Sequence, residues 1–432
     1  MSTVVSPTGT RTPAGTYALP DVAERVTGRS AAAGSSRIGS IDIIRGAVMV
    51  LMAIDHVRVF SGVPAGGPTP GVFFTRWVTH FCAPAFIFLA GTSAFLYGEK
   101  VGDRGVLARF LLTRGAWLVL LELTVLRFAW TFNFDYAHYA LAGVIWVIGW
   151  CMILMAALVY LPVAAIAAIG ASIIALHNVT DLFRPELVRA ASTSSLSWFW
   201  QILYFGGDIA LSARGEDGPQ LAVLYSIIPW IGVMAAGFAF GRVMRLDPAR
   251  RRRVCIALGM GAIATFLVLR GFNLYGDPRP WGAAARGAAA QRFPAPPAIL
   301  QFLATNKYPA SLLFLLMTLG PTILLIPVLE PARGRVARVL TVFGRVPFFY
   351  YVLHIPLIHT IALLISLVRT PQSTGWLIAN HPMMPPDVPA GYMWSLKLLY
   401  AVWAVVIVML YFACRWYARK KAESGNPLLK FL

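Results

Sequence analysis

The sequence predicts an all-α integral membrane protein, a polytopic helical bundle of about ten transmembrane helices with both termini in the cytoplasm. Composition is the first observation behind this prediction, because 58% of the 432 residues are hydrophobic and only 13% are charged. A soluble protein carries about a quarter charged residues, and charges are costly in hydrocarbon. The second observation is that apolar stretches of about 20 residues, the length that crosses a bilayer, recur from residue 41 onwards.

The candidate spans follow one another closely along the chain. They cover residues 41–60, 73–98, 106–128, 139–161, 163–177, 221–241, 254–272, 310–329, 341–367 and 392–417. Two connecting segments, residues 178–220 and 273–309, are too long to be simple turns. The first contains the aromatic stretch SLSWFWQILYFGGDIALS, which suits a re-entrant or interfacial helix as well as an amphipathic segment at the membrane surface.

The basic residues indicate orientation rather than a nucleic-acid partner. The formal net charge is +19, but Lys and Arg occur in short runs between apolar segments, such as Arg250–Arg253. Such runs mark cytoplasmic loops, and an even number of spans returns the C-terminus to the side of the N-terminus. We therefore expect the lipid bilayer, and no nucleic acid, as a partner.

Three regions are expected along the chain. Residues 1–36 are rich in small and polar residues and lack the apolar core of a signal peptide, so they predict a disordered cytoplasmic tail. Residues 37–418 form the membrane domain, and residues 419–432 form a basic cytoplasmic tail. The four cysteines stand singly, with no CxxC pattern, so neither a disulfide framework nor a metal site is expected.

The first span is unusual for a membrane helix because it carries five ionisable side chains. In SIDIIRGAVMVLMAIDHVRVF these are Asp42, Arg45, Asp55, His56 and Arg58. Asp42 can pair with Arg45, three residues on, and Asp55 can pair with Arg58 in the same way. His56 has no local partner and lies about 22 Å along the helix from its inner end, in the outer part of the hydrocarbon core. A neutral imidazole at this depth suits a general base, whereas the alternative is a histidine that only bridges two helices.

Polar side chains at a similar depth in other spans suggest a cavity between helices. They are His80, Glu122, His354 and His359, with Asn306 and Lys307 at the outer mouth of the eighth span. Intramembrane ionisable groups are costly and commonly functional, although for His359 we favour a structural role. Such a cavity would suit a transporter of a small polar or anionic solute, with His56, Glu122 and His354 as a proton relay. The lack of an evident internal repeat counts against the transporter.

Arginines mark the inner ends of several spans. They are Arg45, Arg109, Arg114 and Arg345. Arginine binds phosphate through two parallel hydrogen bonds, but it also snorkels to lipid headgroups, which is the reading we favour for Arg109. For Arg45 and Arg345 we favour ligand binding, because each stands next to a glycine that allows close backbone approach.

At these motifs the chain resembles the transmembrane acyltransferase superfamily. SIDIIRGAVMVLMAIDH resembles the first transmembrane helix of that superfamily, in particular of the bacterial membrane proteins grouped with the heparan-α-glucosaminide N-acetyltransferase catalytic domain. The resemblance continues through THFCAPAFIFLAGTSAF, IPWIGVMAAGFAFG, NKYPASLLFLLMTLGP and FGRVPFFYYVLHIPLIH, and so covers most of residues 37–417.

The resemblance implies an enzyme of the bacterial plasma (inner) membrane. It would take an acetyl group from cytoplasmic acetyl-CoA and deliver it to an acceptor on the far side, often a sugar or amino sugar. In the related sugar O-acyltransferases a histidine stands ten residues after the Arg-Gly pair, and counting from Gly46 assigns the general base to His56. Asp55, Glu122 and His354 are candidates to orient it.

The remaining assignments complete the expected site. We expect coenzyme A at Arg45, Arg114 and Arg345, and the acceptor at His80, Asn306 and Lys307. N- or O-acetylation, a covalent acetyl-histidine or direct transfer, and a homodimer or another oligomeric state all stay open.

Overall fold

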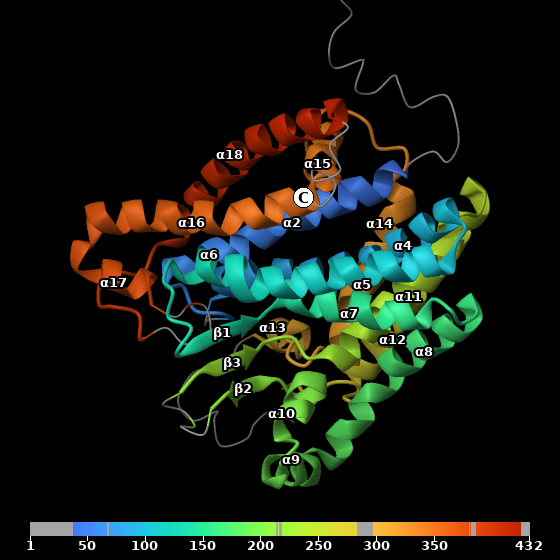
Figure 1. The fold of residues 1–432 in the computed structure, drawn as a ribbon, viewed down its shortest axis with the longest axis horizontal. Coiled ribbons are helices and arrows are strands. Elements are labelled where there is room, and N and C mark those ends of the chain that lie inside the picture. The colour runs from blue at the N-terminus through green and yellow to red at the C-terminus, as the bar shows by residue number, and fades with distance from the viewer. Residues whose placement is uncertain are drawn as a thin grey trace, which may run out of the picture. The chain divides into compact units, whose positions relative to one another are not determined.

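A computed structural model describes residues 38–66, 69–212, 215, 218–282, 297–379, 381 and 386–424. The tail expected at residues 1–36 lies outside these residues, and so do residues 425–432 of the tail expected at 419–432, whose first part continues the last helix to Glu423. The long helices are α2 (Gly39–Ser61), α4 (Cys82–Val101), α5 (Arg104–Leu121), α7 (Val144–Leu158), α8 (Val163–Leu176), α11 (Ile227–Met244), α12 (Pro248–Gly271), α14 (Leu312–Leu329), α16 (Pro347–Arg369) and α18 (Leu396–Glu423). The predicted, mostly helical fold is therefore confirmed (Figure 1).

Shorter elements extend or connect these helices. They are α3 (Pro70–Trp77), η1 (Val78–Phe81), η2 (Glu122–Leu126), α6 (Arg127–Thr131), η3 (His177–Phe183), α9 (Arg184–Thr193), α10 (Ser197–Trp200), η4 (Gln201–Phe205), α13 (Ala298–Leu303), α15 (Arg335–Arg345), η8 (Pro371–Ser373) and α17 (Thr374–Leu377). The elements α3 and η1 run directly into α4, and η2 and α6 continue α5.

Seven helical segments in the described residues are long and apolar enough to cross a membrane. They are Pro70–Val101, Val163–Phe183, Ile227–Met244, Pro248–Gly271, Leu312–Leu329, Pro347–Arg369 and Leu396–Glu423. Of the other long helices, α2 and α5 carry several charged residues, and α7 is short. The count of ten spans and the cytoplasmic position of the termini remain predictions.

A small sheet departs from the all-α prediction. The strands β1 (Tyr139–Ala142), β3 (Gln220–Val223) and β2 (Gly207–Ala210) lie side by side in that order (Figure 1). β1 pairs with β3 in parallel, and β2 pairs with β3 antiparallel. The spans expected at 139–161 and 221–241 thus begin as strands, because a four-residue apolar strand looks like the start of a hydrophobic helix to a hydropathy window.

The span expected at 341–367 is also divided. α15 ends at Arg345 and α16 begins at Pro347. The proline has no N–H to continue the first helix, and the residue before it, Val346, leaves helical geometry with φ −130° and ψ 51°. The chain therefore turns here, and α15 packs against α2 and α18 instead of continuing into the bundle.

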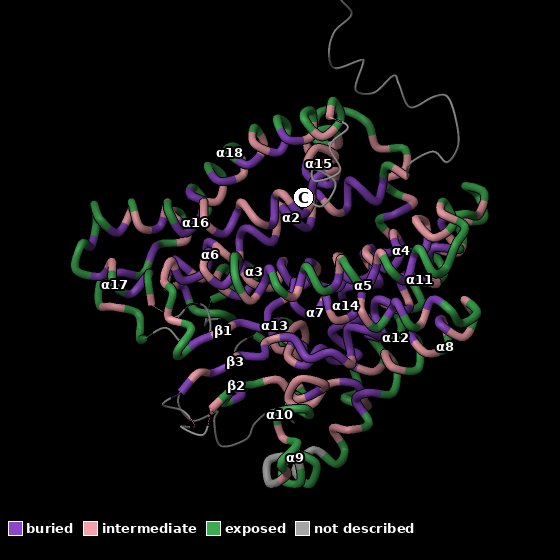
Figure 2. Tube along the Cα trace, in the orientation of Figure 1, coloured by how far each residue is buried: buried purple, intermediate pink, exposed green. Residues whose placement is uncertain are grey.

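Helix α2 is the core of this arrangement. It contacts α4, α14, α15, α16 and α18, and Figure 2 shows it buried along most of its length. A Cβ atom on Gly46 would stand 1.9 Å from the backbone oxygen of Leu340, and one on Gly344 would stand 1.9 Å from that of Asp42. The backbones of α2 and α15 therefore touch where they cross, as small residues allow in membrane proteins.

Candidate functional site

The described residues enclose a cavity of about 350 Å³ at one end of the bundle. It lies where α2 and the α5–η2–α6 segment end and where α4, α7 and α11 begin. Its polar and aromatic lining residues are Asp55, His56, Arg58, Arg76, Thr79, Cys82, Glu122, Trp130, Tyr225, Lys307, Tyr308 and Tyr351. The polar cavity expected between helices is therefore present.

His56 lines this cavity and bonds to a second histidine behind it. Its Nδ1 atom is 2.6 Å from Nε2 of His354, on α16. The Nδ1 atom of His354 is 2.6 Å from the backbone oxygen of Tyr351, and because a carbonyl only accepts, this nitrogen carries the proton. In neutral His354 the Nε2 atom must then accept, so Nδ1–H of His56 donates to it. The basic nitrogen of His56 is therefore Nε2, the atom not engaged by His354.

The pairing depends on the register between α2 and α16, which run in the same direction. The hydroxyl of Tyr350 donates to the backbone oxygen of Met49 at 2.9 Å, one to two turns before the histidines. The rings of Trp130 and His56 pack edge to face at 75°, with centroids 4.9 Å apart. His56 is thus held from two sides, and its partner is a residue that no local sequence pattern indicates.

The ion pair expected between Asp55 and Arg58 is confirmed. Oδ1 of Asp55 accepts from Nε of Arg58 at 2.6 Å, and Nη1 of Arg58 donates to the backbone oxygen of Val63 at 2.9 Å. Within the described contacts no hydrogen bond joins Asp55 to His56. The role of Asp55 in catalysis stays a prediction.

Glu122 lies in the cavity wall with the contacts of a helix cap. Its Oε2 atom accepts from the backbone N–H groups of Ile145 at 3.0 Å and Trp146 at 3.2 Å, in the first turn of α7. A Cβ atom on Gly143 would stand 2.6 Å from Oε1 of Glu122, so the glycine leaves room for the carboxyl group. These bonds satisfy helix donors that otherwise have no partner, and the predicted catalytic role is untested.

The residues expected to bind the acceptor separate into different places. Lys307 lines the cavity. Asn306 lies beside it and donates from its side chain to the backbone oxygens of Tyr308 and Pro309, which shapes the loop. His80 is buried but is not part of the cavity lining, and its ring centroid lies 5.5 Å from that of Phe314. Its Nδ1 atom has no hydrogen-bond partner among the described residues.

The arginines expected to bind coenzyme A lie away from the cavity, near the junction of α15 and α16. Arg45 donates to the backbone oxygen of Leu89 at 3.0 Å and also to the hydroxyl of Ser93. The guanidinium carbon of Arg114 is 5.7 Å from the ring centroid of Phe348, at the start of α16. Arg345 has a buried Nε atom with no hydrogen-bond partner in the described part of the chain.

The role expected for the two glycines next to Arg45 and Arg345 is wrong. Gly46 and Gly344, the neighbours of Arg45 and Arg345, were expected to let a ligand approach the backbone. They instead let α2 and α15 approach each other. Coenzyme A binding by the three arginines itself remains untested.

Several residues of the cavity were not expected from the sequence. Arg76, Tyr225, Tyr308, Trp130 and Tyr351 all line it. Arg76 carried a signal, because it is a charge inside the apolar run FFTRWVTHF, as costly as those singled out in α2. Aromatic side chains carry no such signal, since they are as common in a core as in a site.

Together the fold and the site define a helical membrane protein with a histidine-lined cavity at one end of the bundle. Among the residues that the structure describes, no group of three or more His, Cys, Asp or Glu side chains is placed to hold a metal ion. Residues 37–274 match the family described as heparan-alpha-glucosaminide N-acetyltransferase, catalytic, and the chain belongs to this family of acetyltransferases. No curated protein matches the chain. The family match includes His56 and Arg76 but ends before Lys307 and His354.

Proposed function

We propose that the protein is a membrane-embedded acetyltransferase that moves an acetyl group from cytoplasmic acetyl-CoA to an acceptor, a sugar or amino sugar, bound in the cavity from the other side of the membrane. His56 acts as the general base. The observation that carries this proposal is the pairing of His56 with His354, which supplies a neutral base with Nε2 free for the acceptor.

The chemistry follows from this tautomer. Nε2 of His56 removes the proton from the acceptor hydroxyl or amine as that atom attacks the thioester carbonyl of acetyl-CoA. The carbon–sulfur bond then breaks, and the leaving thiolate takes the proton from His56. Acetylated acceptor and coenzyme A are the products, and the histidine returns to its starting state.

The place of the donor follows from the length of α2. Arg45 and His56 are eleven residues apart in this helix, or about 16 Å along its axis. Phosphates held at Arg45, Arg114 and Arg345 would leave the pantetheine arm to extend along α2 towards the cavity. Always-charged guanidinium groups suit this role, because they bind phosphate with two parallel hydrogen bonds.

The test of the base uses the purified full-length protein in lipid nanodiscs. Release of coenzyme A is followed with a thiol reagent, and acetylated products from a panel of sugars and amino sugars are identified by mass spectrometry. His56→Ala should lower the rate by roughly 10²-fold or more while acetyl-CoA binding, measured by calorimetry, is kept.

The matched control is His138→Gln, because His138 is an exposed histidine paired with Asp135 at 2.7 Å and lies outside the cavity lining. Its rate should equal that of the unmodified protein. Full activity in His56→Ala would overturn the assignment of the base.

A further inference from the structure

The charges around the cavity do not balance. Three cationic side chains line it, Arg58, Arg76 and Lys307, against two acidic ones, Asp55 and Glu122. Both acidic groups are already engaged. Asp55 pairs with Arg58 at 2.6 Å, and Glu122 accepts the two N–H groups at the start of α7. Two cations, Arg76 and Lys307, are left without a carboxylate of their own.

Arg76 lies next to a phenol. Its side chain is close to Tyr308, which is close in turn to Tyr225, and the Asp55 carboxylate, whose charge also acts on Arg76, is already hydrogen-bonded to Arg58. A phenol accepts from the guanidinium group but does not neutralise it, and a guanidinium group has five N–H donors in a planar fork. Donors of Arg76 therefore remain for another acceptor on the cavity side.

Of the two cations, Lys307 gives the stronger evidence for a missing anionic partner. Its side chain is buried, with the residue 8% exposed, and its Nζ atom lies 5.2 Å from the ring centroid of Tyr308 and 5.9 Å from that of Tyr225. In the part of the chain that the structure describes, this ammonium group makes no hydrogen bond and no ion pair. A buried charge is costly unless it is paired and hydrogen-bonded.

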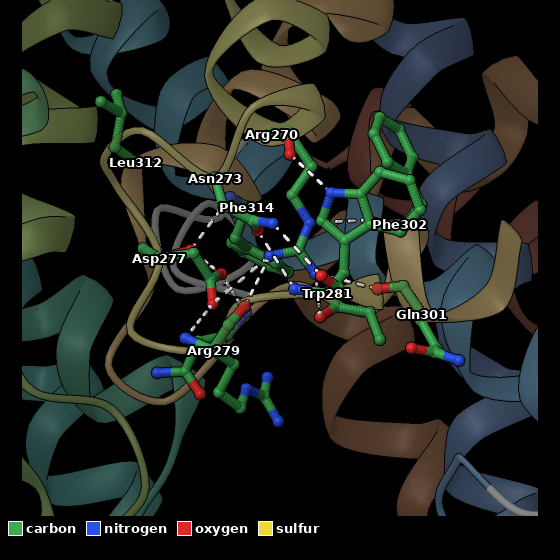
Figure 3. A network of polar contacts seen from close by, with 12 residues as sticks. Arg270, Asn273, Asp277, Arg279, Trp281, Gln301, Phe302, Leu312 and Phe314 are labelled. Atoms are coloured by element: carbon green, nitrogen blue, oxygen red, sulfur yellow. Dashed lines mark hydrogen bonds and ion pairs between the residues drawn. The ribbon is translucent and has the colours of Figure 1, made fainter. Parts of the chain in front are cut away.

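The loop that carries Lys307 is fixed in place from outside the cavity. Asp277 accepts from the backbone N–H of Asn306 at 2.7 Å and from the hydroxyl of Ser311 at 2.8 Å. Figure 3 shows Asp277 and the guanidinium group of Arg270, which donates to four backbone carbonyls of residues 279 and 301–304. The backbone that carries Lys307 is thus held in place before any ligand arrives, which lowers the entropy lost on binding.

We propose that the acceptor carries an anionic group, a carboxylate or a phosphate or sulfate ester, which binds to Lys307 and Arg76 while the reacting hydroxyl or amine lies at Nε2 of His56. This inference rests on the proposed function and adds the substrate class. Both groups line the same cavity, whose 350 Å³ lies in the range of small-ligand sites. A neutral acceptor would leave the ammonium group unpaired and should bind more weakly.

Binding without acetyl-CoA tests this inference separately from catalysis. Glucuronate is compared with glucuronamide, its neutral counterpart, by calorimetry on the full-length protein in nanodiscs, and glucose 6-phosphate is compared with glucose. We expect the anionic member of a pair to bind roughly tenfold or more tightly, as for hydrogen bonds to charged groups. Inorganic phosphate serves as a probe without a sugar and should raise the melting temperature. Preference for glucuronate or for glucose 6-phosphate identifies the anionic group.

Variants connect the preference to the residue. Lys307→Met should abolish both the preference and the effect of phosphate, and Lys307→Arg, which keeps the charge, should retain them. Lys397→Met is the matched control, since Lys397 is an exposed lysine on α18 outside the cavity lining. His56→Ala should keep the preference, so a failed base assignment and a failed anion site give different results.

Two outcomes would overturn the inference. One is equal affinity within both sugar pairs together with the same phosphate effect in the unmodified protein and in Lys307→Met. The other is a Lys307→Met variant that loses affinity for coenzyme A but not for the anionic sugar, which would place the donor at this lysine.

Discussion

At the scale of residues, the pairing of two histidines determines what the cavity can do. A histidine that lined the cavity alone could expose either nitrogen and would change tautomer with its surroundings. Here the chain from His56 to His354 to the backbone oxygen of Tyr351 leaves one arrangement of protons in the neutral state. In the proposed mechanism His354 is a positioning residue, because it would act on the reaction through His56 and does not line the cavity.

This role predicts graded effects at position 354. His354→Leu removes the acceptor for Nδ1–H of His56 and should lower kcat roughly tenfold or more, since the imidazole loses its orientation and tautomer. His354→Gln can still accept from His56 and should recover part of the rate. The pH dependence of kcat should change in the leucine variant, and an unchanged profile and rate would show that His354 only fills space.

His381, between α17 and α18 and outside the membrane-spanning segments, predicts a pH dependence of stability. Burial lowers its pKa to about 4, from an ordinary value of 6.5. Between pH 6.5 and about pH 4, His381 is protonated in the unfolded chain but neutral in the folded chain. The free energy of unfolding should therefore fall on acidification, by about 2 kcal/mol between pH 7 and pH 5.

The measurement is the free energy of unfolding of the protein and of His381→Gln at both pH values. Glutamine does not titrate, so the variant should lose less stability on acidification. A loss of equal size in both proteins would contradict the prediction.

At the scale of elements, two glycines fix where α15 crosses α2. Gly46→Ala and Gly344→Ala would each place a Cβ atom 1.9 Å from a backbone oxygen of the other helix. Backbone cannot yield as a side chain can, so we expect each variant to lose at least 1–3 kcal/mol of stability, as overpacked cores do. Gly261→Ala is the control, because nothing lies within 4 Å of its added Cβ. A thermal denaturation series should show loss only at the crossing, and an unchanged melting temperature for Gly46→Ala would show that the crossing is loose.

The elements also show how far the sequence could predict the structure. Hydropathy predicted the long helices, because each contains a run of consecutive apolar residues that a hydropathy window detects. It placed the strands β1 and β3 inside helices and joined α15 to α16, since a four-residue strand and a turn at Pro347 leave little trace in a long window. The sequence indicated His56 and the Asp55–Arg58 pair through local spacing. It could not indicate which distant residue would meet His56, because that depends on the register of α2 against α16.

At the scale of the whole molecule, the cavity and the expected donor arginines lie towards opposite ends of α2, and the two ends should face opposite sides of the membrane. Single cysteines introduced at exposed positions in intact cells test this. Asp387→Cys, between α17 and α18, should react with a membrane-impermeant maleimide. Arg333→Cys, between α14 and α15, should react only after permeabilisation. The four native cysteines are buried, and because Cys82 lines the cavity, the protein without added cysteines is labelled in parallel as the control. Labelling of both positions from outside would disprove the proposed orientation.

The contact of His354 with a backbone oxygen has a consequence for energy coupling. A carbonyl does not titrate, so among the described contacts a proton that reaches His56 has no carrier beyond His354, and in the proposed mechanism it leaves His56 for the coenzyme A thiolate. A proton relay across the membrane through His56 and His354 would therefore stop at the backbone oxygen of Tyr351. Acetyl transfer should therefore be electrically silent, and a protonophore that collapses the membrane potential should leave the initial rate in sealed vesicles unchanged.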